Sequence, residues 1–335
     1  MSPQTNNYYT PKKRHILRGL SQLIVLALLA ATVFAERQTI YDQWQLHGYT
    51  APAVVANLAT QDGMTGYARK IYYVNHPSVL TGAQFNLACP SNGGEKTIVL
   101  GCYHGGQRGI ALLSVNDPLL NGVEQVTAAH EMLHAAYDRL STSEKNKIDA
   151  LLQNYYQHDL HDARLLGIID AYKLSEPNDL VNEMHSVFGT EISSLPLPLE
   201  KYYQRYFTNR SIVVAFASKY QAEFTNRQNI VAQNDAQLAT LKAQIEFIQS
   251  DLQIKLTAIY ANQSRLQGLR DSDVPAYNAG VPAYNQLVDR YNYEARNLQA
   301  LVAQYNQLVN SRNAVALEVD QLAKELSSNT AQINK

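Results

Sequence analysis

Residues 121–140 read NGVEQVTAAHEMLHAAYDRL. Apolar side chains recur along this stretch at spacings of three and four, the period of a helix with one buried face. The sequence Ser141-Thr-Ser-Glu144 has the form of a capping box that starts the next helix, so we predict that this helix ends near Leu140. His130 and His134 are then one turn apart on the same face, with Cβ atoms about 6 Å apart. Two imidazoles at that spacing can bind one metal ion.

A carboxylate follows the first of these histidines. Glu131 is placed to take a proton from a water molecule at a metal held by the two imidazoles. The same five-residue pattern also arises by chance, and the alternative is a core helix that carries two hydrogen-bonded histidines. The position of the histidines on the apolar seam favours a metal, because an unpaired polar group is costly there.

The segment Ala129-His-Glu-Met-Leu-His-Ala135 resembles the active-site helix of the zincin metallopeptidases. The resemblance extends over about residues 67–192. It implies a Zn²⁺ ion bound by His130 and His134, with Glu131 as the catalytic base. In that family an edge strand ahead of the helix binds the peptide substrate in extended form, and we expect residues 109–115 to supply this strand.

Zincins differ in their third zinc ligand. The metzincin pattern is absent, because residue 137 is Tyr and residue 140 is Leu where that pattern has Gly and His. The gluzincin pattern takes a Glu from a later helix, and Glu183, 49 positions after His134, is in a suitable place. The resemblance therefore implies Glu183 as the third metal ligand.

Glu183 belongs to a predicted short helix, residues 178–188, which we expect Gly189 to end. His185 and Glu191 are rival ligands from the same region. Neither Glu183 nor His185 lies at the centre of the apolar face, so the periodicity does not choose between them. The resemblance alone favours Glu183.

A peptidase of this type also needs a hydrogen-bond donor for the oxyanion of its tetrahedral intermediate. Tyrosine and histidine side chains are available in this region, and the sequence does not choose among them. They are Tyr137, Tyr155, Tyr156, His158, His161 and Tyr172.

The C-terminal third has heptad periodicity. Apolar residues repeat every seven positions from Val231 to Leu266, and a second seam runs from Tyr284 to Leu326 after a break at 271–275. We predict an antiparallel helical hairpin with arms of roughly 80 Å. Polar residues interrupt the seams at four positions, which are Asn234, Lys255, Asn262 and Arg312.

The remaining exported part is mixed in character. We predict helices over residues 36–46 and 52–58 and strands over 70–74, 97–103 and 110–115. The predicted fold class is thus α+β, a zincin-like mixed domain with an active-site helix, followed by a long coiled-coil hairpin. The predicted domains are a leader (residues 1–35), a zincin-like domain (36–207) and the hairpin (208–335).

The leader has a basic flank, with positive charges from Lys12 to Arg18, followed by an apolar run from Leu20 to Ala35. This pattern is typical of a secretory signal peptide or a signal anchor. Val33-Phe34-Ala35 resembles a cleavage site, whereas an uncleaved leader would hold the chain in the membrane through residues 16–35. Both outcomes place the rest of the chain outside the cytoplasm.

Composition narrows the class of protein. The chain has 335 residues and a net charge of −1, so its charge gives no reason to predict that it binds nucleic acid. Its two cysteines, Cys89 and Cys102, lie in the exported part and are close enough in sequence to form one disulfide. Two reduced thiols are the alternative.

These observations predict an exported or membrane-anchored zinc metallopeptidase acting on peptides or proteins. The first alternative is a zinc-stabilised but non-catalytic envelope protein whose hairpin binds a partner or self-associates. The intact Glu131 argues against it, since a structural site has no use for that carboxylate. The second alternative is a coiled-coil envelope protein without a metal.

Overall fold

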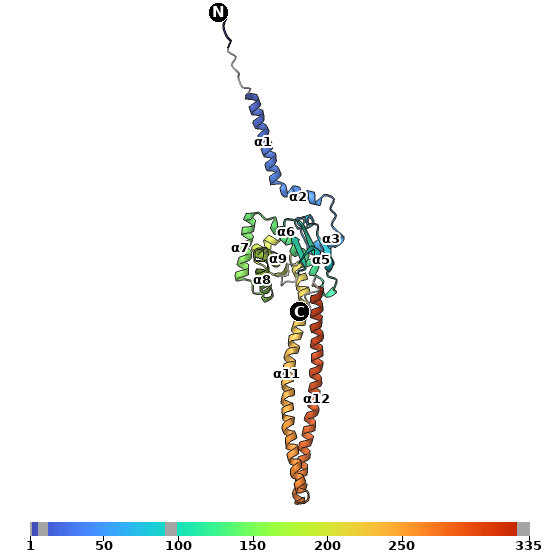
Figure 1. Ribbon diagram of the computed structural model, residues 1–335. Coiled ribbons are helices and arrows are strands. Elements are labelled where there is room, and N and C mark those ends of the chain that lie inside the picture. Colours follow the sequence, from blue (N-terminus) through green and yellow to red (C-terminus); the bar gives the residue numbers. More distant parts are fainter. Residues whose placement is uncertain (1, 6–12, 91–98, 327–335) are drawn as a thin grey trace. The chain divides into compact units, whose positions relative to one another are not determined.

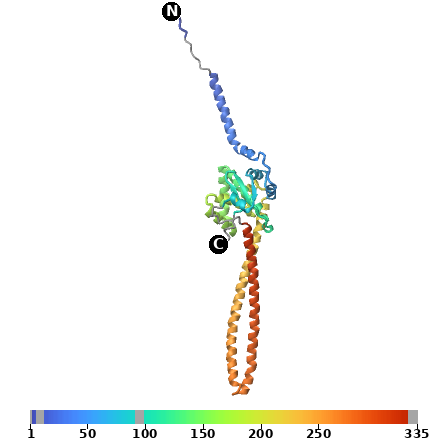
Figure 2. The same cartoon turned by 45° about the vertical axis from the view of Figure 1, so that its right-hand side comes forward.

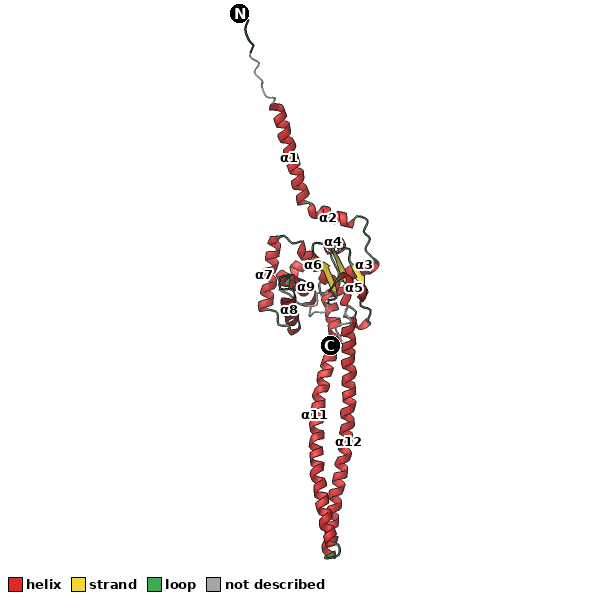
Figure 3. Cartoon of the chain, viewed as in Figure 1, coloured by secondary structure: helices red, strands yellow, loops and turns green. Residues whose placement is uncertain are grey.

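The computed structural model describes residues 2–5, 13–90 and 99–326. These residues are mostly helical, with a small three-stranded sheet and two long C-terminal helices (Figure 3). They form two compact units. The first comprises the described residues within 1–80, 101–112 and 127–212, and the second comprises those within 81–100, 113–126 and 213–335. Each unit is therefore assembled from separate stretches of sequence, whereas the predicted domains are continuous.

The N-terminal helix α1 spans Lys13–Ala35, within the predicted leader, and Lys12 lies outside the described residues. No single helix among the described residues is both long enough and apolar enough to cross a membrane. Two helical segments that meet at a bend of 60°, Gln22–Ala35 and Arg37–Leu46, satisfy both requirements together. The leader remains a prediction.

Two short helices follow. Helix α2 (Arg37–Leu46) coincides with the helix expected over residues 36–46, and α3 (Ala53–Gln61) covers the one expected over 52–58. Asp42 on α2 is 2% exposed and forms ion pairs with Lys70 at 2.9 Å and with Arg139 at 2.8 Å. This buried carboxylate therefore ties α2 to two cations from later parts of the chain.

The strand predicted over residues 70–74 is wrong, because these residues form the end of helix α4 (Gly66–Val74). Thr65 is the N-cap, and its hydroxyl accepts a hydrogen bond from the Ala68 N–H at 3.2 Å. Ala68 and Ile71 are both fully buried, at the helical spacing of three. The cap and this spacing outweigh the β propensity of the run Ile71-Tyr-Tyr-Val74.

The sheet contains β1 (Ser78–Leu80), β2 (Gly101–His104) and β3 (Gly109–Leu113) in the order β1-β3-β2. Strands β2 and β3 form an antiparallel hairpin in which Gly101 pairs with Leu112. Strand β3 confirms the core of the strand predicted over residues 110–115. Strand β2 is shorter than its predicted span, 97–103, of which residues 97 and 98 lie outside the described residues.

The expectation that residues 109–115 form an edge strand is wrong. Strand β3 lies between β1 and β2, and its residues from Ile110 to Leu113 are all buried. An apolar strand is most stable where its two edges and its faces are covered. The central position of β3, with β1 on one edge and β2 on the other, provides this cover. Of the two strands in the hairpin, β2 is the one at the edge of the sheet.

Helices make up the rest of the first unit. Helix α7 starts at the predicted capping box, since the Ser141 hydroxyl accepts from the Glu144 N–H and the Glu144 carboxylate accepts from the Ser141 N–H. The preceding helix α6 ends at Asp138, close to the predicted end at Leu140. The bounds are α6 Val123–Asp138, α7 Thr142–His158, α8 Ala163–Ser175, α9 Leu180–Glu191 and α10 Leu197–Tyr203.

The expected end of α9 at Gly189 is wrong, since the helix continues to Glu191. A Cβ atom at Gly189 would lie 2.5 Å from Leu133 Cδ1 and 2.7 Å from Tyr203 Cε1. Gly189 is therefore a contact point at which α9 approaches α6 and α10, and its missing side chain permits that approach.

In the second unit, α11 (Ser211–Leu269) and α12 (Val274–Glu325) run side by side as an antiparallel pair (Figures 1 and 2). Two of the polar residues that interrupt the seams form ion pairs between the arms. Lys255 contacts Glu294 at 2.7 Å, and Arg312 contacts Asp235 at 2.9 Å. The pairing confirms the antiparallel arrangement expected from the heptads.

The open end of this pair contains a small hydrophobic core. Leu322 and Leu326 of the C-terminal arm are buried against Leu120 and Val123, with Tyr220 and Phe224 packed on the cluster. Leu120 belongs to the short 3-10 helix η1 (Pro118–Leu120), and a further short helix, α5 (Gly82–Ala88), lies earlier in the chain. This core gathers separate stretches of sequence into the second unit.

Both cysteines, Cys89 and Cys102, are disulfide-bonded.

Candidate metal centre

Helix α6 presents two histidines from consecutive turns. The Nε2 atoms of His130 and His134 lie 3.0 Å apart, and the two rings meet edge to face with centroids 4.7 Å apart. Two ring nitrogens that converge in this way can both direct a lone pair at one point between them. The helical spacing seen in the sequence thus produces a pair of convergent nitrogen ligands.

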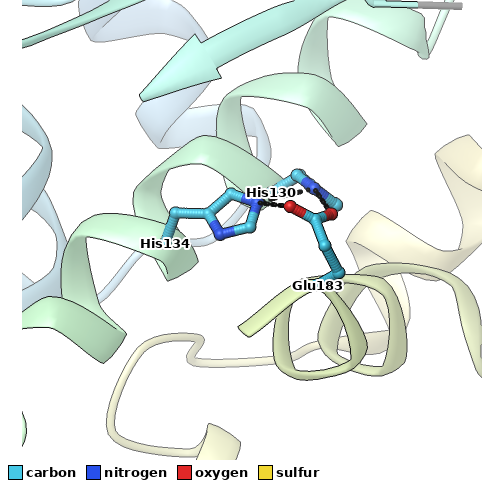
Figure 4. A group of neighbouring side chains, drawn as sticks. All are labelled: His130, His134 and Glu183. Atoms are coloured by element: carbon cyan, nitrogen blue, oxygen red, sulfur yellow. Dashed lines mark hydrogen bonds and ion pairs between the residues drawn. The ribbon is translucent and has the colours of Figure 1, made fainter. Parts of the chain in front are cut away.

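Helix α9 supplies a carboxylate to the same point (Figure 4). The Glu183 Oε1 atom lies 3.4 Å from His134 Nε2, and its Oε2 atom lies 3.6 Å from His130 Nε2. Glu183 is 6% exposed, His134 is 7% exposed and His130 is partly buried. The three side chains therefore form a compact, largely buried group at the contact between α6 and α9.

The spacing of these atoms suits a metal ion. Ligand atoms about 2.0–2.1 Å from a tetrahedral zinc ion are about 3.3–3.4 Å from one another. The two imidazole nitrogens are 3.0 Å apart, and they lie 3.4 and 3.6 Å from the two different oxygens of Glu183, so the separations in the group bracket that value. In the described part of the chain, Oε2 of Glu183 is also buried without a hydrogen-bond partner. This group can therefore hold a metal ion.

The charges within this group shift the pKa values of its own members. Burial lowers the pKa of His130, but its contact with the Glu183 carboxylate and the charge of Glu131 outweigh burial and raise the pKa above its ordinary value. Burial raises the pKa of Glu183, but the charges of His134 and His130 and the contact with His130 lower it overall. The carboxylate is thus kept ionised, the form that binds a cation.

Glu131 lies beside this group but is not part of it. Its side chain packs under β2, where a Cβ atom at Gly101 would lie 2.7 Å from Glu131 Oε1 and 2.6 Å from Thr127 Cγ2. The Tyr103 N–H of the same strand donates a hydrogen bond to the carboxylate. Gly101 is therefore required for the close approach of β2 to α6, and this role was not anticipated. A glycine at the start of a strand is a weak sequence signal for such an approach.

The pKa of Glu131 is raised by burial, against the lowering effect of the His134 and His130 charges. Glu131 as a whole is 6% exposed. A carboxyl with a raised pKa binds and releases a proton closer to neutral pH, which suits a general base.

The two rival ligands lie elsewhere. His185 is fully buried and its Nε2 atom is 2.8 Å from the Tyr202 hydroxyl, within a cluster of tyrosines. Glu191 forms an ion pair with Arg164 at 2.7 Å. The structure thus places Glu183, rather than His185 or Glu191, beside the two histidines.

One of the candidate donors reaches the group. The Tyr172 hydroxyl on α8 donates a hydrogen bond to Glu183. Burial, followed by the charges of Glu183 and Glu131, raises the pKa of Tyr172 well above its ordinary value, so the hydroxyl stays protonated. Tyr172 therefore serves as a neutral donor beside the carboxylates.

The other candidates are engaged elsewhere or exposed. The Tyr137 hydroxyl donates to Asp149 at 2.8 Å, and the Tyr156 hydroxyl is bonded to Lys173. Tyr155 packs edge to face on Phe188. His158 and His161 are exposed. Nothing in the sequence distinguished Tyr172 from these other candidate donors.

No protein-family model, curated protein or solved structure matches this chain.

Proposed function

We propose that this protein is a zinc-dependent metallopeptidase with His130, His134 and Glu183 as zinc ligands and Glu131 as the catalytic base. One observation carries the proposal. Two imidazole nitrogens from α6 and the Glu183 carboxylate from α9 converge with separations of 3.0, 3.4 and 3.6 Å, and the buried carboxylate of Glu131, which is not a ligand, lies next to them.

The donor set supports zinc in particular. Two imidazole nitrogens and one carboxylate oxygen are typical of catalytic zinc sites, which keep a fourth position for water or substrate. A structural zinc site is usually closed by a fourth protein ligand. The group of His130, His134 and Glu183 contains three ligands among the described residues, which favours the catalytic kind of site.

Zinc at this position would polarise a substrate carbonyl and lower the pKa of a water molecule. Glu131 would accept the proton of that water and return it to the leaving amine, and its raised pKa suits both transfers. The Tyr103 N–H holds the Glu131 carboxylate in position for this work. Tyr172 keeps Glu183 oriented through its hydrogen bond, as metal-site carboxylates commonly require.

The substrate would be a peptide or protein in extended form. Strand β2 is the edge strand next to α6, so an added strand would pair with β2 instead of β3. In the β2–β3 hairpin the N–H of Leu113 donates to Leu100 O, which makes Cys102 a hydrogen-bonded position. The backbone groups of Gly101 and the carbonyl of Tyr103 then face the free edge, while the Tyr103 N–H on that side is taken by Glu131. We further propose that the leader exports the enzyme or anchors it in the membrane.

Three variants of the full chain test this function, with zinc measured by elemental analysis and turnover measured on a fluorogenic peptide library. Glu131→Gln should retain about one zinc per chain and lose turnover by about 10²–10⁴-fold. His130→Ala should lose both zinc and turnover. Glu191→Gln is the matched control, because Glu191 is paired with Arg164, and it should keep both.

Two results would count against the proposal. Wild-type protein that binds no zinc after refolding with the metal would leave a coiled-coil protein without a metal. Protein that binds zinc through His130 but cleaves no peptide in the library would favour the non-catalytic envelope protein.

A further inference from the structure

The short helix α2 has two faces of opposite character. Ile40 and Trp44 are four positions apart, so they lie side by side on the surface of the helix. Their exposed fractions are 48% and 70%. This pair, which we call the apolar face of α2, includes the one tryptophan of the sequence. The apolar face leaves the body of a large amphipathic ring in water unless another surface covers it.

The opposite face of α2 is fixed to the first unit. Asp42 lies two positions from both Ile40 and Trp44, which is about 200° around the helix. Its carboxylate pairs with Lys70 at 2.9 Å and with Arg139 at 2.8 Å, and the side chains of Asp42 and Arg139 are both buried. Breaking a buried ion pair is strongly destabilising. Helix α2 therefore cannot turn to bury its apolar face against the first unit.

The apolar surface of helix α1 leads directly to this face. Helix α1 ends at Ala35 and α2 begins at Arg37. From Leu23 to Phe34 the large apolar side chains of α1 are each more than half exposed, so no described part of the protein covers them. The Arg37 guanidinium lies 4.6 Å from the centre of the Phe34 ring, which joins the two helices at their bend. A helix that is apolar on all sides is typically covered by protein or by lipid.

Arg37 adds a positive charge beside the apolar face. It precedes Ile40 by three positions and Trp44 by seven, so it lies on the same side of α2. The other charged residue of α2, Asp42, is buried, and Glu36 lies before the helix at the bend. A cation next to apolar and aromatic side chains complements the phosphates and acyl chains at a phospholipid surface.

We infer that the apolar face of α2 inserts into the interfacial layer of a phospholipid bilayer, with Arg37 at the lipid phosphates. Tryptophan is enriched in this layer because its ring is apolar and its N–H is polar. Helix α2 cannot lie deeper, because its other face carries the Asp42 ion pairs and charged groups are costly in the hydrocarbon core. The bend of 60° between the two helical segments fits one segment that enters the bilayer and one that lies on its surface.

This placement links the membrane contact to the helix of the metal centre. Arg139, which pairs with Asp42, directly follows α6, the helix that carries His130 and His134. One buried ion pair therefore connects the helix at the membrane surface to the helix that holds two metal ligands. The inference rests on the proposal that the leader anchors the chain in the membrane, and it does not depend on zinc or on peptidase activity.

Fluorescence of Trp44 tests this placement in the full chain reconstituted into phosphatidylcholine vesicles. The 22 tyrosines do not absorb at the red edge of the tryptophan band, so Trp44 can be excited alone. Iodide, present on both sides of the bilayer, quenches a tryptophan that is in contact with water. Lipids brominated at different depths along their acyl chains quench a tryptophan that touches them, and the most effective lipid reports its depth.

We expect lipids brominated near the ester carbonyls to quench Trp44 more strongly than lipids brominated near the chain ends. Iodide should quench the wild type about threefold less than Ile40→Asp, in which a charge on the apolar face draws α2 out of the interface. Leu174→Asp is the matched control, because Leu174 is an apolar residue of α8 that is 76% exposed. That variant should leave both kinds of quenching unchanged.

Three results overturn the inference. The first is that Ile40→Asp is quenched by iodide no more than the wild type. The second is shielding of Trp44 from iodide without quenching by brominated lipids, because a second copy or another part of the chain would then cover the apolar face. The third is stronger quenching by lipids brominated near the chain ends, which would place α2 in the hydrocarbon core as part of a bent span.

Two further measurements separate this inference from the proposals on which it rests. If Ile40→Asp does not fold, Ile40→Ser is measured against the same criteria. Full chain that does not sediment with the vesicles would refute the membrane anchor together with this inference. Full chain that sediments with them while Trp44 stays in water would refute this inference alone.

Discussion

Replacing Gly189 by alanine should both destabilise the protein and weaken zinc binding. A Cβ atom at this position would lie 2.5 Å from Leu133 Cδ1 and 2.7 Å from Tyr203 Cε1. Ordinary carbon contacts are about 3.5–4.0 Å long, so the neighbours or α9 itself must move by about 1 Å. Because Leu133 belongs to the helix that carries both histidines, this movement separates α9 from α6 at the metal site.

The expected size of the effect follows from two opposing terms. Overpacking a close contact costs about 1–3 kcal/mol. Alanine in place of glycine within a helix returns about 1 kcal/mol, which leaves a net loss of up to about 2 kcal/mol. Metal sites tolerate ligand displacements of about 0.2 Å, so we expect zinc affinity to fall about tenfold or more.

Urea unfolding and zinc titration against a competing chelator measure the two quantities. Gly167→Ala is the matched control, because Gly167 is an exposed residue of helix α8 with no atom within 4 Å of the added Cβ. That variant should gain up to about 1 kcal/mol and bind zinc normally. The reasoning fails if Gly189→Ala is stabilised as Gly167→Ala is. Destabilisation with unchanged zinc affinity would refute the link between helix packing and the ligands.

Further predictions concern the metal, the acid limb of stability, the hairpin and the buried histidine. Free zinc at about 100 times its Kd should stabilise the wild type by about 2.7 kcal/mol over a chelated sample, as measured by thermal melting, whereas His130→Ala should not respond. Burial would raise the pKa of Asp42, but the hydrogen bonds and cations around this carboxylate lower the pKa overall. The ionised carboxylate therefore stabilises the fold above the ordinary value of 3.8, and this stabilisation is lost as the pH falls through the lowered pKa. Asp42→Asn should therefore lose stability less steeply than the wild type below about pH 4 in urea unfolding. Leu252→Ala, at a buried seam position of α11, should cost about 2–3 kcal/mol, whereas the exposed Phe247→Ala should change stability by less than about 0.5 kcal/mol in the same assay. His185→Ala should cost about 2–4 kcal/mol and leave the zinc content unchanged, and loss of zinc in this variant would mean that His185 is a ligand.

Several elements could be predicted because local sequence is sufficient to specify them. The hairpin arms α11 and α12 follow from apolar residues repeated over many heptads, a signal that accumulates along the chain. The start of α7 follows from Ser141 and Glu144, which satisfy each other's backbone donors within a single turn. The placement of His130 and His134 on one helix face depends only on their spacing of four.

Other features depend on contacts between distant parts of the chain. The run from Lys70 to Val74 has the composition of a strand. It forms the end of helix α4 because Thr65 caps that helix and one helical face is buried. Strand β3 is recognisable as an apolar strand, but its central position depends on pairing with β1 and β2. Edge or centre is a property of the assembled sheet, which no single strand's sequence contains.

The sequence by itself determined the two histidines, the adjacent Glu131 and the long helical arms, because each depends on helical periodicity within one segment. The tertiary structure alone placed Glu183 beside the histidines and directed His185 toward the tyrosines. Both residues lie on the same helix two positions apart, so they point in different directions, and the choice depends on how α9 rotates against α6. At Gly189 the helices approach so closely that an added Cβ atom would meet Leu133 and Tyr203, and such contacts between residues far apart in the chain are not contained in the sequence of α9.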